Sequence, residues 1–254
     1  MHQSQPEKLR REGLVIKSNI LVQKTTHDLS LEEQKAVAYL CSLIDHRNNE
    51  FILDYVFDIQ DYCKTCGFEW NSGRNYANIR NTLFKLRNNA MILEYDGKKS
   101  PVGWLDRIEL EEHSGKVKIR FDERLIPHLF GLKNKFYKFG LYNILALKSA
   151  YSAHLYEYFQ SLPKNESWFI KLDDLKSMLR IEKIKSYNNF KDFRVKVLEN
   201  SINEINSKTN LSISYKIEKT GRKVTALYFT IKEKEPEERL KTMMQVLLEL
   251  ENSK

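Results

Sequence analysis

The sequence has few cysteines and no long hydrophobic run, and each absence excludes a class of protein. Only 3 of the 254 residues are cysteine, which is too few for a disulfide framework. No stretch is apolar for long enough to cross a bilayer, and no signal-peptide core follows Met1, so we expect a cytoplasmic protein. A phosphate-binding loop of the type G-x-x-x-x-G-K-[ST] is also missing, so no nucleoside triphosphate site is predicted.

Groupings of catalytic or metal-binding side chains are missing as well. Carboxylates are scattered over amphipathic segments, and the many tyrosines have no metal ligands clustered beside them. Cys63 and Cys66 form a C-x-x-C pair, but a structural zinc site needs four ligands and only Cys41 remains. We therefore expect no catalysis, metal or cofactor, and interpret the cysteines as buried structural residues. A zinc or redox site at Cys63 and Cys66, and a tyrosine nickase, are the alternatives.

What the sequence does contain is an excess of positive charge in one region. The net charge is +8 and the isoelectric point is near 9.2. Residues 180–235 hold 13 Lys and Arg against 7 Asp and Glu, a net of +6. Residues 236–254 hold 3 against 4, a net of −1. This distribution favours a polyanionic partner for residues 180–235, such as nucleic acid.

The basic region reads as a helix followed by a hairpin. Phe190, Phe193 and Val197 recur at helical spacing, and Ser186 is a candidate cap for the start of the helix. Residues 211–215 alternate as a strand does, residues 220–223 (TGRK) form a basic turn, and residues 224–231 form the return strand. This order is typical of a winged helix, in which the helix enters a major groove and the hairpin tip lies along phosphates. An ordinary α+β packing unit with solvated charges is the alternative.

The same order of elements occurs earlier in the chain. Tyr76, Ile79 and Leu83 fall 114 positions before the three stripe residues of the second helix (190 − 76), and a hairpin follows at residues 104–121. We therefore predict an α+β fold of two tandem winged-helix domains related as a pseudo-repeat, plus a C-terminal amphipathic helix. We expect that helix to pack on the second domain, with packing on a partner as the alternative. The predicted parts are a flexible N-terminus (1–13), a first domain (14–135), a second domain that is the main DNA reader (136–235) and the C-terminal helix (236–254).

Polar and basic side chains opposite the apolar stripes are the candidate DNA contacts. Asn can pair with adenine, Asp can accept from cytosine, and Lys or Arg can reach guanine or phosphate. In the second domain the candidates are Lys185, Ser186, Tyr187, Asn188, Asn189, Lys191, Asp192, Arg194, Lys196, Arg222 and Lys223. In the first domain they are Arg74, Asn75, Asn78, Arg80, Asn81 and Lys85.

Several segments resemble the initiator replication proteins of theta-replicating, iteron-containing plasmids. The strongest resemblance is to the second winged helix of that family, and weaker ones lie at residues 147–157 and 19–39. His154 stands where the family often has an arginine, and Val195 stands where a basic residue is common. The segments that carry the strongest resemblance are FKDFRVKVL from Phe190, NEIN from Asn203, LSISY from Leu211 and GRKV from Gly221.

The resemblance implies a plasmid replication initiator that is not an enzyme. Such proteins bind direct repeats at an origin as monomers, help to open an adjacent A·T-rich segment, and recruit the host initiator and helicase. As dimers they often bind an inverted repeat and repress their own gene. Dimerisation uses the first domain, so the hairpin that begins at Trp104 and ends at Phe121 is a candidate interface. The alternative is a sequence-specific tandem winged-helix repressor without initiation activity.

Overall fold

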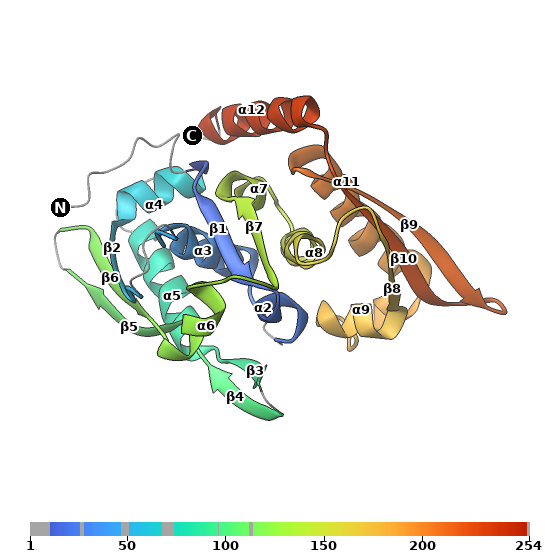
Figure 1. Cartoon of the computed structure of the whole chain (residues 1–254), viewed down its shortest axis with the longest axis horizontal. Coiled ribbons are helices and arrows are strands. Elements are labelled where there is room, and N and C mark those ends of the chain that lie inside the picture. Colours follow the sequence, from blue (N-terminus) through green and yellow to red (C-terminus); the bar gives the residue numbers. More distant parts are fainter. Residues whose placement is uncertain are drawn as a thin grey trace.

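The computed structural model describes residues 11–25, 28–46, 51–67, 74–95, 97–111 and 114–252 (Figure 1). Its helices and strands form two α+β halves with helix α8 (Ala150–Gln160) between them, and helix α12 (Pro236–Asn252) lies across one side of both. Within the described residues, no helix combines the length and the apolar character needed to span a membrane.

The first half contains a three-stranded antiparallel sheet in the order β2-β6-β5. Local sequence signals determine where its helices begin and end. Ser30 and Glu33 form a complete capping box at the start of α3, and Gly67 ends α4 in the left-handed conformation with φ 75°. The elements are β1 (Leu14–Ser18), α2 (Ile20–Gln23), α3 (Leu31–Ser42), β2 (Asp54–Asp58), α4 (Ile59–Cys66), α5 (Arg74–Asn88), β3 (Met91–Tyr95), β4 (Lys98–Val102), β5 (Leu105–Leu110), β6 (Lys116–Phe121), η1 (Glu123–Leu125), α6 (Ile126–Leu129) and β7 (Phe136–Gly140).

The second half contains a sheet in the order β8-β10-β9. Strand β10 is central and pairs with both neighbours in antiparallel register. Its long hairpin with β9 projects away from the body of the molecule (Figure 1). The elements are α7 (Leu141–Leu145), α8, β8 (Ser167–Lys171), α9 (Leu172–Met178), η2 (Lys185–Asn188), α10 (Phe190–Phe193), η3 (Arg194–Glu199), α11 (Asn200–Lys208), β9 (Leu211–Thr220), β10 (Lys223–Glu233) and α12.

The two sheets have the same topology, which supports the predicted pseudo-repeat. In each three-stranded sheet the first strand pairs with the last strand, and that last strand also pairs with the one before it. Strands β2 and β8 begin 113 positions apart (167 − 54), and the short helices α4 and α9 that follow them also begin 113 positions apart (172 − 59). The first half differs by the extra hairpin β3–β4 between its long helix and its sheet hairpin.

Helix α8 joins the hydrophobic cores of the two halves. Tyr156 packs edge-on against Phe139 of β7, with ring centroids 5.2 Å apart. One turn later, Phe159 packs against Phe229 of β10, with centroids 5.0 Å apart. All of these rings are buried in one continuous hydrophobic cluster that includes residues of both halves. We therefore expect the two winged-helix units to be held in a defined relative position by apolar burial.

Three sequence-based expectations are corrected by long-range contacts or local caps. The loose N-terminal segment does not extend to Arg11, whose buried side chain donates to the carbonyl oxygen of Thr65 at 3.0 Å; residues 1–10 lie outside the described part. Strand β7 lies beyond the predicted boundary at residue 135 but pairs with β1, so it packs with the first half. The apolar stretch 143–159, which its apolar composition predicts as one helix, is divided between α7 and α8, because Ser149 caps the start of α8.

The helix of the basic region, residues 190–208, begins later than predicted, and we call it the recognition helix. Ser186 lies in the 3₁₀ turn η2, and it is Asn189 that caps the helix by accepting a hydrogen bond from the Lys191 amide at 2.9 Å. The helix then runs through α10, the π-helical segment η3 and α11 without interruption. A π-helical segment inside an α-helix is rare and often marks a functional site.

The C-terminal helix α12 is present and packs on α7 and α11. Val246 and Leu247 are buried against Tyr142 and Ala146. Lys208 of α11 and Glu249 of α12 approach to 3.5 Å. The helix therefore contacts the second half, as predicted, through its buried side.

Candidate nucleic-acid interface

The recognition helix of the second half is fixed by its apolar side. Phe193, Val197 and Leu198 have no exposed surface, and Ile202 and Ile205 continue the buried stripe. Burial of five apolar side chains at helical spacing leaves the opposite side in solvent. That exposed side carries Lys191, Lys196 and Asn200.

A buried lysine holds the segment that precedes the helix. The Lys176 ammonium donates to the carbonyl oxygen of Tyr187 at 2.6 Å, and it lies 5.6 Å from the ring centroid of Phe193. Burial lowers the pKa of Lys176 from its ordinary value, and the Asp173 carboxylate opposes that shift. Lys176 thereby connects α9, the η2 turn and the first turn of the recognition helix.

The hairpin of β9 and β10 forms the wing. Its two-residue tip is Gly221-Arg222, and Gly221 has φ 61°, a conformation that glycine adopts without a steric cost. Below the tip, the hydroxyls of Thr220 and Thr225 are 3.3 Å apart across the strands. The turn places Lys219, Arg222 and Lys223 in solvent at the end of the wing.

A hollow of about 650 Å³ lies between the start of the recognition helix and the wing. We call it the helix–wing hollow. Five of its lining residues are cationic and one is acidic, so it attracts anions. The side-chain amides of Asn188 and Asn189 in the lining can also donate and accept hydrogen bonds. The lining residues are Leu172, Asp173, Lys176, Asn188, Asn189, Phe190, Arg194, Ile217, Lys219, Arg222, Lys223 and Val224.

The candidate contacts of the second domain fall into three groups in the structure. Tyr187 and Asp192 are half-buried, and Asp192 pairs with Lys196 at 3.6 Å on the exposed side of the helix. Lys185, Ser186, Lys191 and Lys196 are exposed but do not line the helix–wing hollow. The structure brings the remaining five together around that hollow: Asn188, Asn189, Arg194, Arg222 and Lys223.

The candidate contacts of the first domain lie on helix α5. Asn78, Arg80, Asn81 and Lys85 are exposed, whereas the side chains of Arg74 and Asn75 lie outside the described part. Taking about 100° per residue, Arg80 projects from a different side of the helix than Asn78 and Lys85. The Arg80 guanidinium lies 5.8 Å from the ring centroid of the exposed Phe84. The four candidates whose side chains are described therefore do not form one patch.

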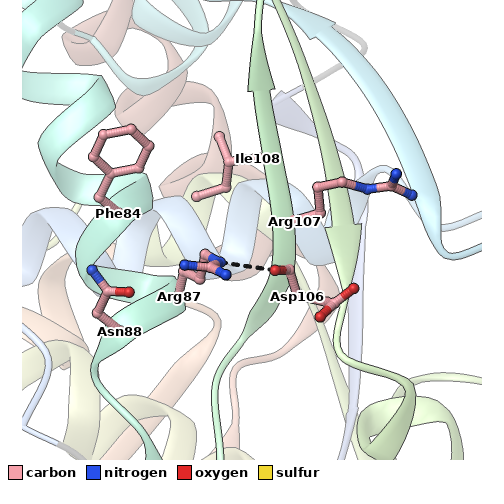
Figure 2. Close-up of a pocket in the computed structure, with 6 residues that line it drawn as sticks. All are labelled: Phe84, Arg87, Asn88, Asp106, Arg107 and Ile108. Atoms are coloured by element: carbon pink, nitrogen blue, oxygen red, sulfur yellow. Dashed lines mark hydrogen bonds between the residues drawn. The ribbon is translucent and has the colours of Figure 1, made fainter.

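A smaller hollow of about 290 Å³ lies where α5 meets β5 (Figure 2). Arg87 crosses it and donates from Nε to the carbonyl oxygen of Asp106 at 2.8 Å. Its lining residues are Phe84, Arg87, Asn88, Asp106, Arg107 and Ile108, none of which was a candidate contact. The neighbouring β3–β4 hairpin presents Lys98 and Lys99, both exposed.

Comparison with known proteins decides the family. The model of the first winged-helix domain of initiator replication proteins (Initiator Replication protein, WH1) matches residues 14–160. The model of the second (Initiator Rep protein, WH2) matches residues 171–231. The chain belongs to the initiator replication protein family. Both domains of that family are winged helices, so the predicted fold is confirmed, and the family is one of DNA-binding initiators.

Individual relatives of this Rep family member come from Escherichia coli. The chain is 30% identical to the PI protein over 159 residues, which are 54% of this chain and 52% of that protein. It thus spans about half the length of that relative. It is 21% identical to an uncharacterized 27.6 kDa protein over 232 residues, covering 85% of this chain and 95% of the other.

A solved structure has the same fold. It is the crystal structure of the Pi initiator protein in complex with iteron DNA, with a TM-score of 0.71 and 21% sequence identity. The similarity covers 89% of this chain and 99% of that chain. At this identity the comparison establishes the shared fold of both winged helices.

Sequence reasoning did not include three side chains of the candidate interface. Lys176 and Lys219 line the helix–wing hollow, and Val195 is 44% exposed on the recognition helix. Lys219 directly precedes the basic turn at residues 220–223, so extending the turn by one residue would have included it. Lys176 lies on another helix and reaches the hollow only through tertiary packing. Val195 was singled out in the sequence as a departure from the family, because a basic residue is common there, and it was not among the candidate contacts.

The C-x-x-C pair lies on helix α4 within the core of the first half. Cys63 and Cys66 are free and buried, as predicted. Burial raises the pKa of Cys63 to about 11 and that of Cys66 to about 12, so both thiols stay protonated at neutral pH. Over the described part of the chain, His, Cys, Asp and Glu do not gather in threes as a metal site requires.

Proposed function

We propose that this chain is a plasmid replication initiator that binds repeated origin sites (iterons) as a monomer through both winged helices. The helix–wing hollow carries the proposal, because it combines five cations with two asparagines at the start of a recognition helix. Membership of the initiator family and the fold shared with the Pi protein support it. Bound in this way, the protein would help to open an adjacent A·T-rich segment and recruit the host initiator and helicase.

Different side chains take different parts in the proposed complex. The exposed side of the recognition helix enters the major groove, where Asn188 and Lys196 reach base edges. The wing residues Arg222 and Lys223 lie along the phosphate backbone and set the register of the protein on the duplex. Helix α5 of the first half reads a second stretch of groove with Asn78, Asn81 and Lys85.

Footprinting on the DNA that flanks the gene would test binding to repeats. We expect protection that recurs at a fixed spacing, and a plot of log K against log salt concentration with a slope of about −5 to −10, as when two domains each neutralise several phosphates. A slope near −2 would contradict engagement of both domains.

A replication assay separates initiation from repression alone. A plasmid that carries the origin region and this gene should replicate in a suitable host, and a frameshift in the gene should abolish replication. Operator binding without replication in several hosts would leave a tandem winged-helix repressor as the function. Incubation of supercoiled origin DNA with protein and Mg²⁺ should leave it unnicked, in contrast to a nickase.

We further propose that a dimer forms through the first winged helix and represses the gene. Strand β5 supports this, because it stands at the edge of the β2-β6-β5 sheet, where a second strand can add. Hydrogen exchange gives a direct test. Amides of β5 should become more protected as protein concentration rises, while amides of the β9–β10 hairpin should not change. Concentration-independent exchange along β5 would contradict this interface.

A further inference from the structure

Arg194 and Glu199 are paired across the π-helical segment of the recognition helix. Arg194 Nε lies 3.5 Å from Glu199 Oε1. The Tyr215 hydroxyl of the wing donates to the same oxygen at 3.2 Å, and so fixes the carboxylate. Residues five apart lie about 140° from each other around an α-helix, whereas the i to i+5 repeat of a π-helix aligns them. The π-helical segment therefore makes this pair possible.

The pair engages one edge of the guanidinium and leaves the other free. Arg194 Nε is fully buried and meets Glu199 as an ion pair rather than through a hydrogen bond, although the side chain as a whole is 39% exposed. Within the described residues, no hydrogen bond or ion pair engages Nη1 or Nη2 of Arg194. Arg194 also lines the helix–wing hollow, beside Lys219 and Arg222 of the wing. The two terminal amino groups are thus available to a ligand in that hollow.

We propose that Glu199 is a positioning residue, which holds Arg194 so that its two Nη groups bind one DNA phosphate in the helix–wing hollow. This inference rests on the proposed function of the hollow. A guanidinium that is oriented beforehand loses less conformational freedom on binding, and its planar fork matches two phosphate oxygens. The neighbouring wing cations and the absence of a second acid in the hollow favour a phosphate over a base edge.

The opposing effect is repulsion, because Glu199 is itself an anion near the DNA. If repulsion dominated, neutralising Glu199 would strengthen binding. Asp173 provides a matched control, since it is the one acidic residue lining the same hollow and, within the described residues, no ion pair joins it to Arg194. Asp173→Asn removes the same charge without releasing the arginine. Because Asp173 also acts on the Lys176 ammonium, the variant measures repulsion once its thermal unfolding is shown to match that of the parent.

The test compares full-length variants by fluorescence anisotropy on a duplex that carries one footprinted repeat, at several salt concentrations. Glu199→Gln should weaken binding about tenfold, whereas Asp173→Asn should strengthen it. Arg194→Ala should weaken binding about tenfold and make the salt slope shallower by about 1. In the Arg194→Ala background, Glu199→Gln should no longer weaken binding. Tyr215→Phe should weaken binding in the same direction as Glu199→Gln, by a smaller factor.

Two results would overturn the inference. Tighter binding by Glu199→Gln, matching Asp173→Asn, would mean that the carboxylate only repels DNA. Weakening that persists in the Arg194→Ala background would mean that Glu199 acts on the helix rather than on the arginine. Thermal unfolding of each variant identifies loss of fold. If the unmodified protein bound no repeat, the proposed function itself would fail, which is a separate outcome.

Discussion

Lys17 on β1 and Glu157 on α8 form a buried ion pair, with 2.7 Å between Nζ and Oε2. The Lys17 side chain is only 3% exposed. The Tyr137 hydroxyl donates to the same carboxylate at 3.0 Å, and the ammonium lies 5.7 Å from the ring centroids of Trp104 and Tyr137. This cluster ties the first winged helix to the helix that also contacts the second.

Removing one partner of that pair should destabilise the whole protein. Lys17→Met leaves the Glu157 carboxylate buried with a tyrosine hydroxyl as its remaining donor, so the free energy of unfolding should fall by about 3–5 kcal/mol. Urea unfolding followed by circular dichroism measures it. The double variant Lys17→Met/Glu157→Gln should recover part of the loss, because no unpaired charge remains. If Lys17→Met were as stable as the parent, the ion pair would contribute nothing to the free energy of unfolding.

His154, one turn before Glu157, should make stability depend on pH. Burial lowers its pKa to about 4 from an ordinary value of 6.5. The unfolded chain therefore binds a proton below pH 6.5 that the folded protein does not bind until about pH 4. Stability should be complete above pH 6.5 and fall by up to about 3 kcal/mol on acidification to pH 4.

His154→Gln isolates that effect from other groups. Burial also lowers the pKa of His46 and His128, so the variant should keep a residual loss of stability in acid, with a shallower slope than the parent. Chemical unfolding at half-unit intervals between pH 7 and pH 4 gives both slopes. Equal slopes would show that His154 is accessible to protons in the folded protein.

Arg222 at the wing tip should contribute to affinity without contributing to specificity. Arg222→Ala should weaken binding of cognate and unrelated duplexes by the same factor and reduce the salt slope by about 1, as loss of one phosphate contact does. Lys232→Ala is the matched control, since Lys232 is exposed on the same strand at the end far from the tip. Selective loss for the cognate duplex would instead place Arg222 on a base.

Local signals account for much of the fold that could be predicted. The Ser30–Glu33 capping box, the left-handed Gly67 and the Gly221 turn each act within a few residues, so their effect is visible in the sequence. The pairing of β1 with β7 joins segments more than 120 positions apart (136 − 14), and no local pattern specifies it. The predicted domain boundary was misplaced for that reason.

The candidate site was predictable where it follows from helix periodicity and turn chemistry. The turn sequence predicts Arg222 and Lys223 as contacts, and the helical periodicity predicts Arg194. All three line the helix–wing hollow. The start of the helix was missed because Ser186 and Asn189 are both good caps, and the η2 turn held by Lys176 decides between them. The π-helical segment also changes which residues lie on the same side of the helix. A constant angle of about 100° per residue does not describe that change.

Val195 should read a thymine methyl group on the recognition helix. It is 44% exposed between Arg194 and Lys196, on a helix that we propose enters the major groove, and an apolar side chain there can contact the C5-methyl group of thymine. Replacing thymine by uracil at each position of the repeat removes one methyl group at a time. One substitution should weaken binding of the parent by about 1 kcal/mol and leave binding of Val195→Ala unchanged. If Val195→Ala and the parent lose the same affinity at every uracil, Val195 does not touch a thymine methyl group.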